Sequence, residues 1–192
     1  MTDLAERRGV ETEVYQPAED SALLASVAEA VVESDDRVLE VGTGSGWVAE
    51  QVATETGADV VASDLNPHAT RQARDRGIEA VRADLVSGFR DGAFDVVLFN
   101  PPYLPEDAAA ARDDWMETAL TGGEDGRAVV DPFVESVSRV LADDGYVLVL
   151  VSSLTGVDEV VELAGECGFS VVALREESYP FETLSVLKLV RA

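Results

Sequence analysis

The sequence predicts an α/β fold in which an open, mostly parallel sheet carries helices on both faces. Apolar, β-branched runs alternate along the chain with segments whose apolar residues recur at helical spacing, which is typical of strands joined by crossover helices. Near the N-terminus, a strand runs into a loop with three alternating glycines and then into a helix. That order is the nucleotide-binding start of a doubly wound sheet, whose ligands bind at the carboxyl ends of the strands.

The composition is that of a globular protein of 192 residues, with 46% hydrophobic residues. Residues 1–14 are polar and charged and do not resemble a signal peptide, so we expect a flexible N-terminus followed by a single domain over 15–192. The sequence has no run of about 18 apolar residues, so no membrane span is expected. The only cysteine, Cys167, and the only histidine, His68, exclude an internal disulfide and a metal cluster built from such residues. A cytoplasmic location and no metal are therefore expected.

The formal net charge is −24, from 38 acidic and 14 basic residues. A small domain with this charge repels itself in dilute buffer, whereas molar salt shortens the Debye length to about 3 Å and screens the repulsion. The charge therefore indicates a protein from a high-salt cytoplasm, such as that of a halophilic archaeon. The sequence has no basic patch to neutralise phosphates, which argues against a nucleic-acid partner.

The first expected helix begins near Pro17, because proline suits the first helical turn and Glu19 and Asp20 there complement the helix dipole. Apolar residues then recur at helical spacing as far as position 32. The simple interpretation is an amphipathic helix that packs on the sheet. Ser21, near the start of this helix, could also face a ligand.

The glycine loop follows the first expected strand, Arg37–Val41, and precedes a helix over Trp47–Thr56. Glycine permits positive φ and a close approach of the backbone to a ligand, and Gly42 and Gly44 are the candidates for that contact. The spacing G-x-G-x-G differs from the dinucleotide spacing G-x-G-x-x-G. Glu40, just ahead of the glycines, would repel a pyrophosphate but suits a cationic ligand.

Acids end the next two expected strands. Asp64 lies 22 residues after Gly42, which is the place of a ribose-binding acid; the alternative is that it caps the following helix. The short third strand, 78–83, ends at Asp84 and Leu85. Asp84 could accept a hydrogen bond from the exocyclic amine of an adenine, with Leu85 under the ring.

The fourth expected strand, 94–99, stops at Asn100, Pro101, Pro102 and Tyr103. The prolines lack an N–H and fix φ, so they make a rigid corner at the carboxyl end of the strand. The Asn100 side-chain carbonyl and the Pro101 backbone carbonyl could accept both N–H groups of a planar –NH2, and Tyr103 offers a flat face for stacking. The alternative is an ordinary Asn-Pro turn with a packed tyrosine.

The rest of the chain continues the alternation of helices and strands. The polar segment 105–120 has no clear period and is interpreted as a mobile lid or a substrate-docking segment. The last two strands are expected to be antiparallel, because the connection between them is too short for a crossover helix. The expected elements are a helix over 128–141, a strand over 146–151, a helix over 157–164, and strands over 170–174 and 184–190.

Together these residues resemble the class I S-adenosylmethionine-dependent methyltransferases, and Asn-Pro-Pro-Tyr is similar to the form found in enzymes that methylate planar nitrogen. Residues 14–21, 122–127 and 182–188 further resemble the short archaeal-eukaryotic branch of the HemK family. That branch methylates the glutamine of the Gly-Gly-Gln motif in class I translation release factors. Leu120 is a departure, because the branch often carries a tryptophan there.

The resemblance implies a Rossmann-like, seven-stranded sheet with the last strand reversed, and S-adenosyl-L-methionine as the cofactor. It implies that Asn100, Pro101 and Tyr103 are catalytic and that Asn100, Pro101, Pro102 and Tyr103 contact the substrate. It places the cofactor on Ser21, Glu40, Gly42, Gly44, Asp64, Asp84, Leu85 and Asn100.

The resemblance also implies a small zinc-binding activator subunit along the sheet edge, which is expected at strand 78–83. The alternative substrate is DNA adenine, methylated at N6, or another small or protein acceptor. The charge and the lack of a target-recognition domain argue against DNA. An NAD-dependent enzyme or a non-catalytic nucleotide-binding module is a more distant alternative, which the glycine spacing and the Asn-Pro-Pro-Tyr corner disfavour.

Overall fold

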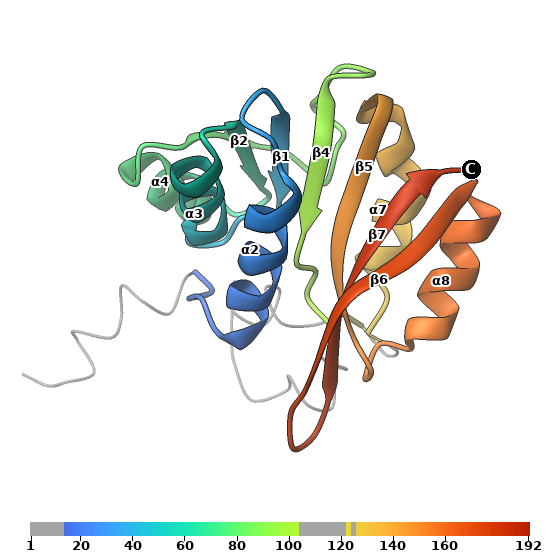
Figure 1. The fold of residues 1–192 in the computed structure, drawn as a ribbon. Coiled ribbons are helices and arrows are strands. Elements are labelled where there is room, and N and C mark those ends of the chain that lie inside the picture. Colours follow the sequence, from blue (N-terminus) through green and yellow to red (C-terminus); the bar gives the residue numbers. More distant parts are fainter. Residues whose placement is uncertain (1–13, 104–121, 124–125) are drawn as a thin grey trace, which may run out of the picture.

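The computed structural model describes residues 14–103, 122–123 and 126–192. Its centre is a seven-stranded sheet in the order β3-β2-β1-β4-β5-β7-β6 (Figure 1). The five strands from β1 to β5 are parallel, and β7 is antiparallel to both β5 and β6, which confirms the predicted fold class. The strands are β1 Arg37–Val41, β2 Asp59–Asp64, β3 Glu79–Arg82, β4 Phe94–Phe99, β5 Leu141–Ser152, β6 Phe169–Ser178 and β7 Thr183–Arg191.

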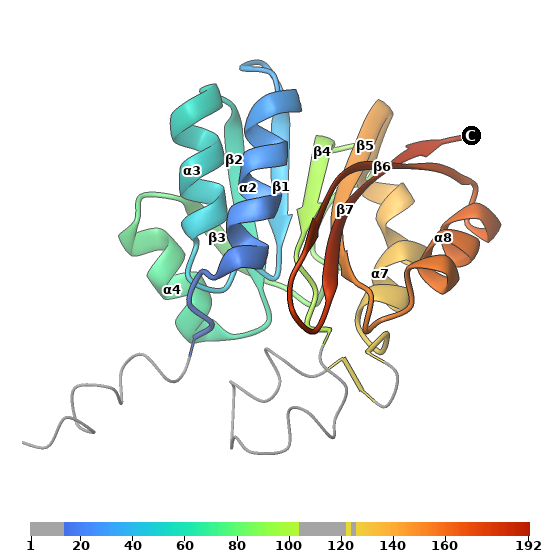
Figure 2. The same cartoon turned by 60° about the horizontal axis from the view of Figure 1, so that its bottom comes forward.

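Helices cover both faces of the sheet, as Figure 2 shows. Alternate residues of β4 point into two separate cores: Val96 and Leu98 pack with one set of helices, and Val97 and Phe99 with the other. Such continuous apolar strands are expected where a parallel sheet is buried on both faces. The first core contains α2 Glu19–Val31, α3 Trp47–Thr56 and α4 Pro67–Asp75, and the second contains α7 Val130–Val137, η1 Ser138–Val140 and α8 Val157–Glu166.

The boundary between α7 and β5 differs from the predicted one. The helix expected over 128–141 is shorter, and β5 begins at Leu141 instead of Tyr146. Leu141 is buried and pairs with Phe94, and the register shifts before Val96 pairs with Tyr146. The Arg191 guanidinium donates to the carbonyl of Leu141 at 2.8 Å. A strand pairing and an arginine from the end of the chain therefore set a boundary that helical periodicity alone placed too late.

The last two strands form a longer hairpin than predicted, and its tip extends beyond the rest of the sheet in Figure 1. Their antiparallel pairing is confirmed from Phe169 opposite Arg191 to Ser178 opposite Thr183. Residues 175–178 are polar and largely exposed, so they carry no apolar pattern that would have marked them as strand.

Two predicted segments fall on other parts of the chain. The expected lid, 105–120, lies outside the described residues. The same is true of the expected flexible N-terminus except for Val14, which is 5% exposed and lines the main cavity. None of the helices in the described part of the chain combines the length and the apolar character needed to cross a membrane.

Candidate functional site

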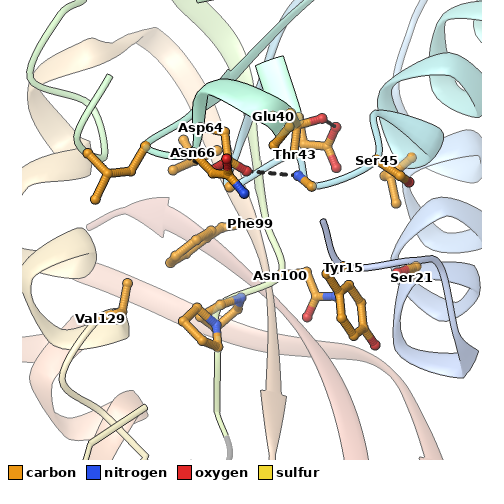
Figure 3. Close-up of a pocket in the computed structure, with 18 of the residues that line it drawn as sticks. Tyr15, Ser21, Glu40, Thr43, Ser45, Asp64, Asn66, Phe99, Asn100 and Val129 are labelled. Atoms are coloured by element: carbon orange, nitrogen blue, oxygen red, sulfur yellow. Dashed lines mark hydrogen bonds between the residues drawn. The ribbon is translucent and has the colours of Figure 1, made fainter. Parts of the chain in front are cut away.

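A cavity of about 410 Å³ opens at the carboxyl ends of β1, β2 and β4. Every residue predicted to contact a cofactor or a substrate lines it, from Ser21 on α2 to Tyr103 after β4. Figure 3 shows Glu40 and Asp64 on one side of this cavity and Asn100 and Tyr15 on the other. The predicted lining residues are Ser21, Glu40, Gly42, Gly44, Asp64, Asp84, Leu85, Asn100, Pro101, Pro102 and Tyr103.

The glycine loop adopts a backbone conformation that disfavours side chains at two positions. Gly42 and Gly44 have φ of +64° and +53°, in the region that favours glycine. A Cβ on Gly42 would lie 3.3 Å from the Phe99 ring, and one on Gly44 would lie 3.4 Å from the Tyr15 carbonyl oxygen. Backbone groups therefore line the cavity at the loop.

Asp64 is fixed by the backbone on both oxygens. Its Oδ2 accepts from the Gly44 N–H at 2.9 Å, and its Oδ1 accepts from the Asn66 N–H at 2.8 Å. Asp64 does not cap α4; Asn66 does, with its Oδ1 accepting from the His68 N–H at 2.8 Å. Burial raises the pKa of Asp64, and these backbone donors oppose the rise. A carboxylate offers about four lone-pair sites. Its remaining acceptor capacity suits the two hydroxyls of a ribose.

Glu40 is 3% exposed and accepts hydrogen bonds from the Thr43 hydroxyl and from the Ala49 N–H. Burial raises its pKa to about 8, because the charged carboxylate loses its hydration there. A cation in the cavity would favour the charged form. This end of the cavity therefore suits a positively charged ligand group, as Glu40 led us to predict. The part played by Thr43 was not predicted.

At the opposite wall, Asn100 contacts an acid from a distant part of the chain. The Asn100 Nδ2 donates to Asp20 Oδ2 at 3.0 Å, and the Tyr15 hydroxyl also donates to Asp20 at 3.0 Å. The Asn100 Oδ1 is buried and has no hydrogen-bond partner among the described residues. Sequence analysis assigned Asp20 only a role in the helix dipole, since nothing local to Asp20 shows that it is buried beside Asn100.

The segment before α7 packs against the Asn-Pro-Pro-Tyr corner. Gly126 has φ of +77°, and a Cβ there would lie 2.7 Å from the Tyr103 carbonyl oxygen. The Ala128 N–H donates to the Gly122 carbonyl at 2.8 Å, and the Arg127 guanidinium donates to the Thr155 carbonyl at 3.0 Å. The glycine-rich turn therefore packs backbone against backbone at the Asn-Pro-Pro-Tyr corner.

Comparison with known proteins identifies the family. A methyltransferase domain model matches residues 38–123. A protein of Methanocaldococcus jannaschii, whose name gives it provisionally as a protein N5-glutamine methyltransferase, is 37% identical over 185 residues, which are 93% of this chain and 92% of the relative. Human methyltransferase HEMK2 is 31% identical over 199 residues, which are 96% and 93% of the two chains. The chain belongs to the HemK family of methyltransferases.

Solved structures agree with this assignment. The E. cuniculi Mtq2 structure, determined as an Mtq2–Trm112 complex responsible for methylation of the eRF1 translation termination factor, is 31% identical to this chain with a TM-score of 0.78. The match covers 94% of this chain and 99% of that one. P. horikoshii TYW2 in complex with MeSAdo, at 14% identity and a TM-score of 0.63, shares the fold. This HemK-family chain is thus a class I methyltransferase, and S-adenosyl-L-methionine is its cofactor.

Proposed function

We propose that this protein methylates the side-chain amide nitrogen of a glutamine, that of the Gly-Gly-Gln motif in a class I translation release factor. The observation that carries the proposal is the buried Asn100 Oδ1 at the rigid corner after β4, which no described residue hydrogen-bonds. An acceptor in this state suits a ligand that brings an N–H, and a primary amide brings two. The relatives named for glutamine methylation, and the Mtq2 complex that acts on eRF1, support glutamine as that amide.

The cavity offers a matching group for each part of the cofactor. We assign the ribose hydroxyls to Asp64, the adenine to Asp84 and Leu85, and the cationic methionine part to Glu40 and the backbone of Gly42 and Gly44. Ser21 would close the cavity from α2. When bound, the cofactor supplies an electrophilic methyl group on a sulfonium. The chain itself supplies alignment and charge complementarity.

The corner would act on the acceptor nitrogen. An amide nitrogen is a poor nucleophile because its lone pair is delocalised into the carbonyl. The Asn100 Oδ1 and the Pro101 carbonyl would accept its two N–H groups and stabilise the positive charge that develops there in the transition state. The methylated nitrogen is acidic and would then lose one of these protons to water, which leaves a neutral secondary amide. The Tyr103 ring would stack on the planar amide, and Pro102 would keep the strand end rigid.

A methylation assay tests the substrate. The protein is incubated at molar salt with labelled cofactor and one of three acceptors: purified release factor, the same factor with alanine at its Gly-Gly-Gln glutamine, or duplex DNA rich in adenine. We expect label in the first acceptor alone. Equal label in the alanine variant, or label in DNA only, would contradict the proposed substrate; the second result would support the adenine alternative.

A small activator subunit is proposed at β3, and a translation factor as substrate would place both proteins in the cytoplasm. In the sheet order, β3 is the strand beyond β2 (Figure 2), so one of its edges has no strand beside it among the described residues. The Arg74 guanidinium donates to the Ala80 carbonyl at 2.8 Å. A partner strand would take over this carbonyl and pair with the edge, in the β-augmentation mode. The Mtq2–Trm112 complex supports a partner of this kind.

Introducing a charge at each of the two sheet edges tests the partner site. Ala80 is 3% exposed and packs in the core, so a charge there would unfold the chain and not only block a partner. Val81 is half-buried at the same edge, and Val172 on β6 is 54% exposed at the opposite edge. Val81→Lys should abolish co-purification with the co-expressed activator, and the matched Val172→Lys should not. Loss of the complex in both variants, or in neither, would contradict a site on β3.

A further inference from the structure

We propose that Asp20 is a positioning residue that sets the orientation of the Asn100 amide, so that its oxygen and not its –NH2 group meets the acceptor nitrogen. This inference rests on the proposed function for its consequence in catalysis. The orientation itself is a property of the free protein. The contact joins the first turn of α2 to the end of β4, across 80 positions of sequence.

Asp20 is a buried carboxylate that collects donors. It is 4% exposed. Its Oδ1 accepts from the Ser21 N–H at 2.6 Å and lies 3.3 Å from the Ser21 hydroxyl. Its Oδ2 accepts from Asn100 Nδ2, and the Tyr15 hydroxyl lies 3.0 Å from both oxygens. No described Lys or Arg forms an ion pair with it. Hydrogen bonds from neutral groups thus replace the water that burial removes.

This carboxylate distinguishes the two ends of the amide. An ionised carboxylate only accepts hydrogen bonds, whereas a primary amide donates at one end and accepts at the other. The –NH2 of Asn100 must therefore face Asp20, and its Oδ1 must face the cavity. A buried acceptor without a donor is costly, and a bound N–H removes that cost. The arrangement favours a methyl-accepting group that donates an N–H hydrogen bond to Asn100. It disfavours a group that presents a lone pair to Asn100.

An isosteric change would invert the arrangement. In Asp20→Asn, the Ser21 N–H still requires an acceptor, so the new amide oxygen stays on that side and the new –NH2 group faces Asn100. Two –NH2 groups cannot hydrogen-bond to each other. Asn100 would then turn its carbonyl toward α2 and present its –NH2 to the cavity. Adding the second change Asn100→Asp would restore the pattern. One carboxylate oxygen at position 100 would accept from the new –NH2 group at position 20, and the other would face the cavity as a hydrogen-bond acceptor.

The chain offers a direct view of this amide, because Asn66 and Asn100 are its only asparagines. With ¹⁵N-asparagine labelling, two side-chain –NH2 groups are seen, without cofactor or substrate. We expect the Asn100 protons to show one strongly deshielded, slowly exchanging signal that is lost in Asp20→Asn, while the Asn66 signals stay in place. Tyr15→Phe is the matched control, since it removes another donor to Asp20 but keeps the carboxylate and so should keep the Asn100 signal. An unchanged Asn100 signal in Asp20→Asn would overturn the proposal.

Kinetics on the release factor complete the test. We expect Asp20→Asn to lower kcat by on the order of 10-fold to 100-fold with the cofactor Kd unchanged, because the acceptor nitrogen is misaligned. Asp20→Asn with Asn100→Asp should recover part of that loss. A wild-type kcat in the single variant, or no recovery in the double variant, would refute positioning by Asp20. If the wild-type protein leaves the release factor unmethylated, the proposed substrate fails, and the amide signals alone decide the role of Asp20.

Discussion

Asp64→Ala should weaken cofactor binding without unfolding the protein. The Asp64 carboxylate already accepts from the Gly44 and Asn66 N–H groups, and we expect its remaining acceptor capacity to take the two ribose hydroxyls. Losing two such bonds should cost about 1–3 kcal/mol, which is a rise in Kd of about 5-fold to 150-fold. Titration calorimetry with S-adenosylhomocysteine measures this directly, and circular dichroism checks that the variant is folded.

Two controls separate a contact with the ribose from a general effect on the glycine loop. Asp64→Asn keeps one acceptor oxygen but brings a donor toward the Gly44 or Asn66 N–H, so its Kd should lie between those of the wild type and Asp64→Ala. A cofactor analogue without the 2′-hydroxyl should show a smaller penalty for Asp64→Ala than the full cofactor does, because the two changes remove the same bond. An unchanged Kd in folded Asp64→Ala, or an equal penalty with both ligands, would refute the ribose assignment.

Three further predictions follow from burial, backbone geometry and charge. Because the pKa of Glu40 is raised to about 8 and a cation favours its charged form, cofactor affinity should increase as pH rises from 6 to about 8 and then level off. Calorimetry across this pH range should find no such increase in Glu40→Gln. An equal increase in that variant would contradict the prediction. Gly126→Ala should destabilise the protein by about 1–3 kcal/mol in urea unfolding, since its Cβ meets the Tyr103 carbonyl. The control Gly165→Ala, with open space around it on α8, should be neutral or stabilising. Equal changes in the free energy of unfolding would refute the packing argument. The melting temperature should rise between about 0.1 M and 2 M KCl, because the charge of −24 is screened, and a flat or falling curve would contradict an adaptation to high salt.

Local chemistry allowed the fold and the cavity to be predicted from the sequence. The two prolines after β4 and the glycines after β1 restrict the backbone on their own, so their positions could be assigned without knowledge of the rest of the chain. Because parallel strands present their carboxyl ends at one edge, Asp64 and Asn100 could also be expected at a common site. The cavity brings them together.

What the sequence did not reveal depends on distant partners. The start of β5 at Leu141 is set by pairing with Phe94 and by Arg191 at the far end of the chain. The contact between Asp20 and Asn100 requires knowing how α2 lies against the end of β4. The helix dipole alone explains an acid in the first turn of a helix. The residues around Asp20 in the sequence therefore do not indicate that its side chain is buried. The capping of α4 by Asn66 and not Asp64 is a smaller case, where two neighbouring residues both suit the role.

The most direct test of the proposed chemistry is fragment mass spectrometry of the release factor after reaction with wild-type protein or with Asn100→Ala. The Asn100 corner is held by prolines and by the packing of Gly126, so the variant should fold normally. We predict one added methyl group on the Gly-Gly-Gln glutamine with the wild type and no detectable methylation with Asn100→Ala. Methylation at near-native rate by the variant, or a methyl group at another residue, would contradict an alignment of the glutamine amide by Asn100.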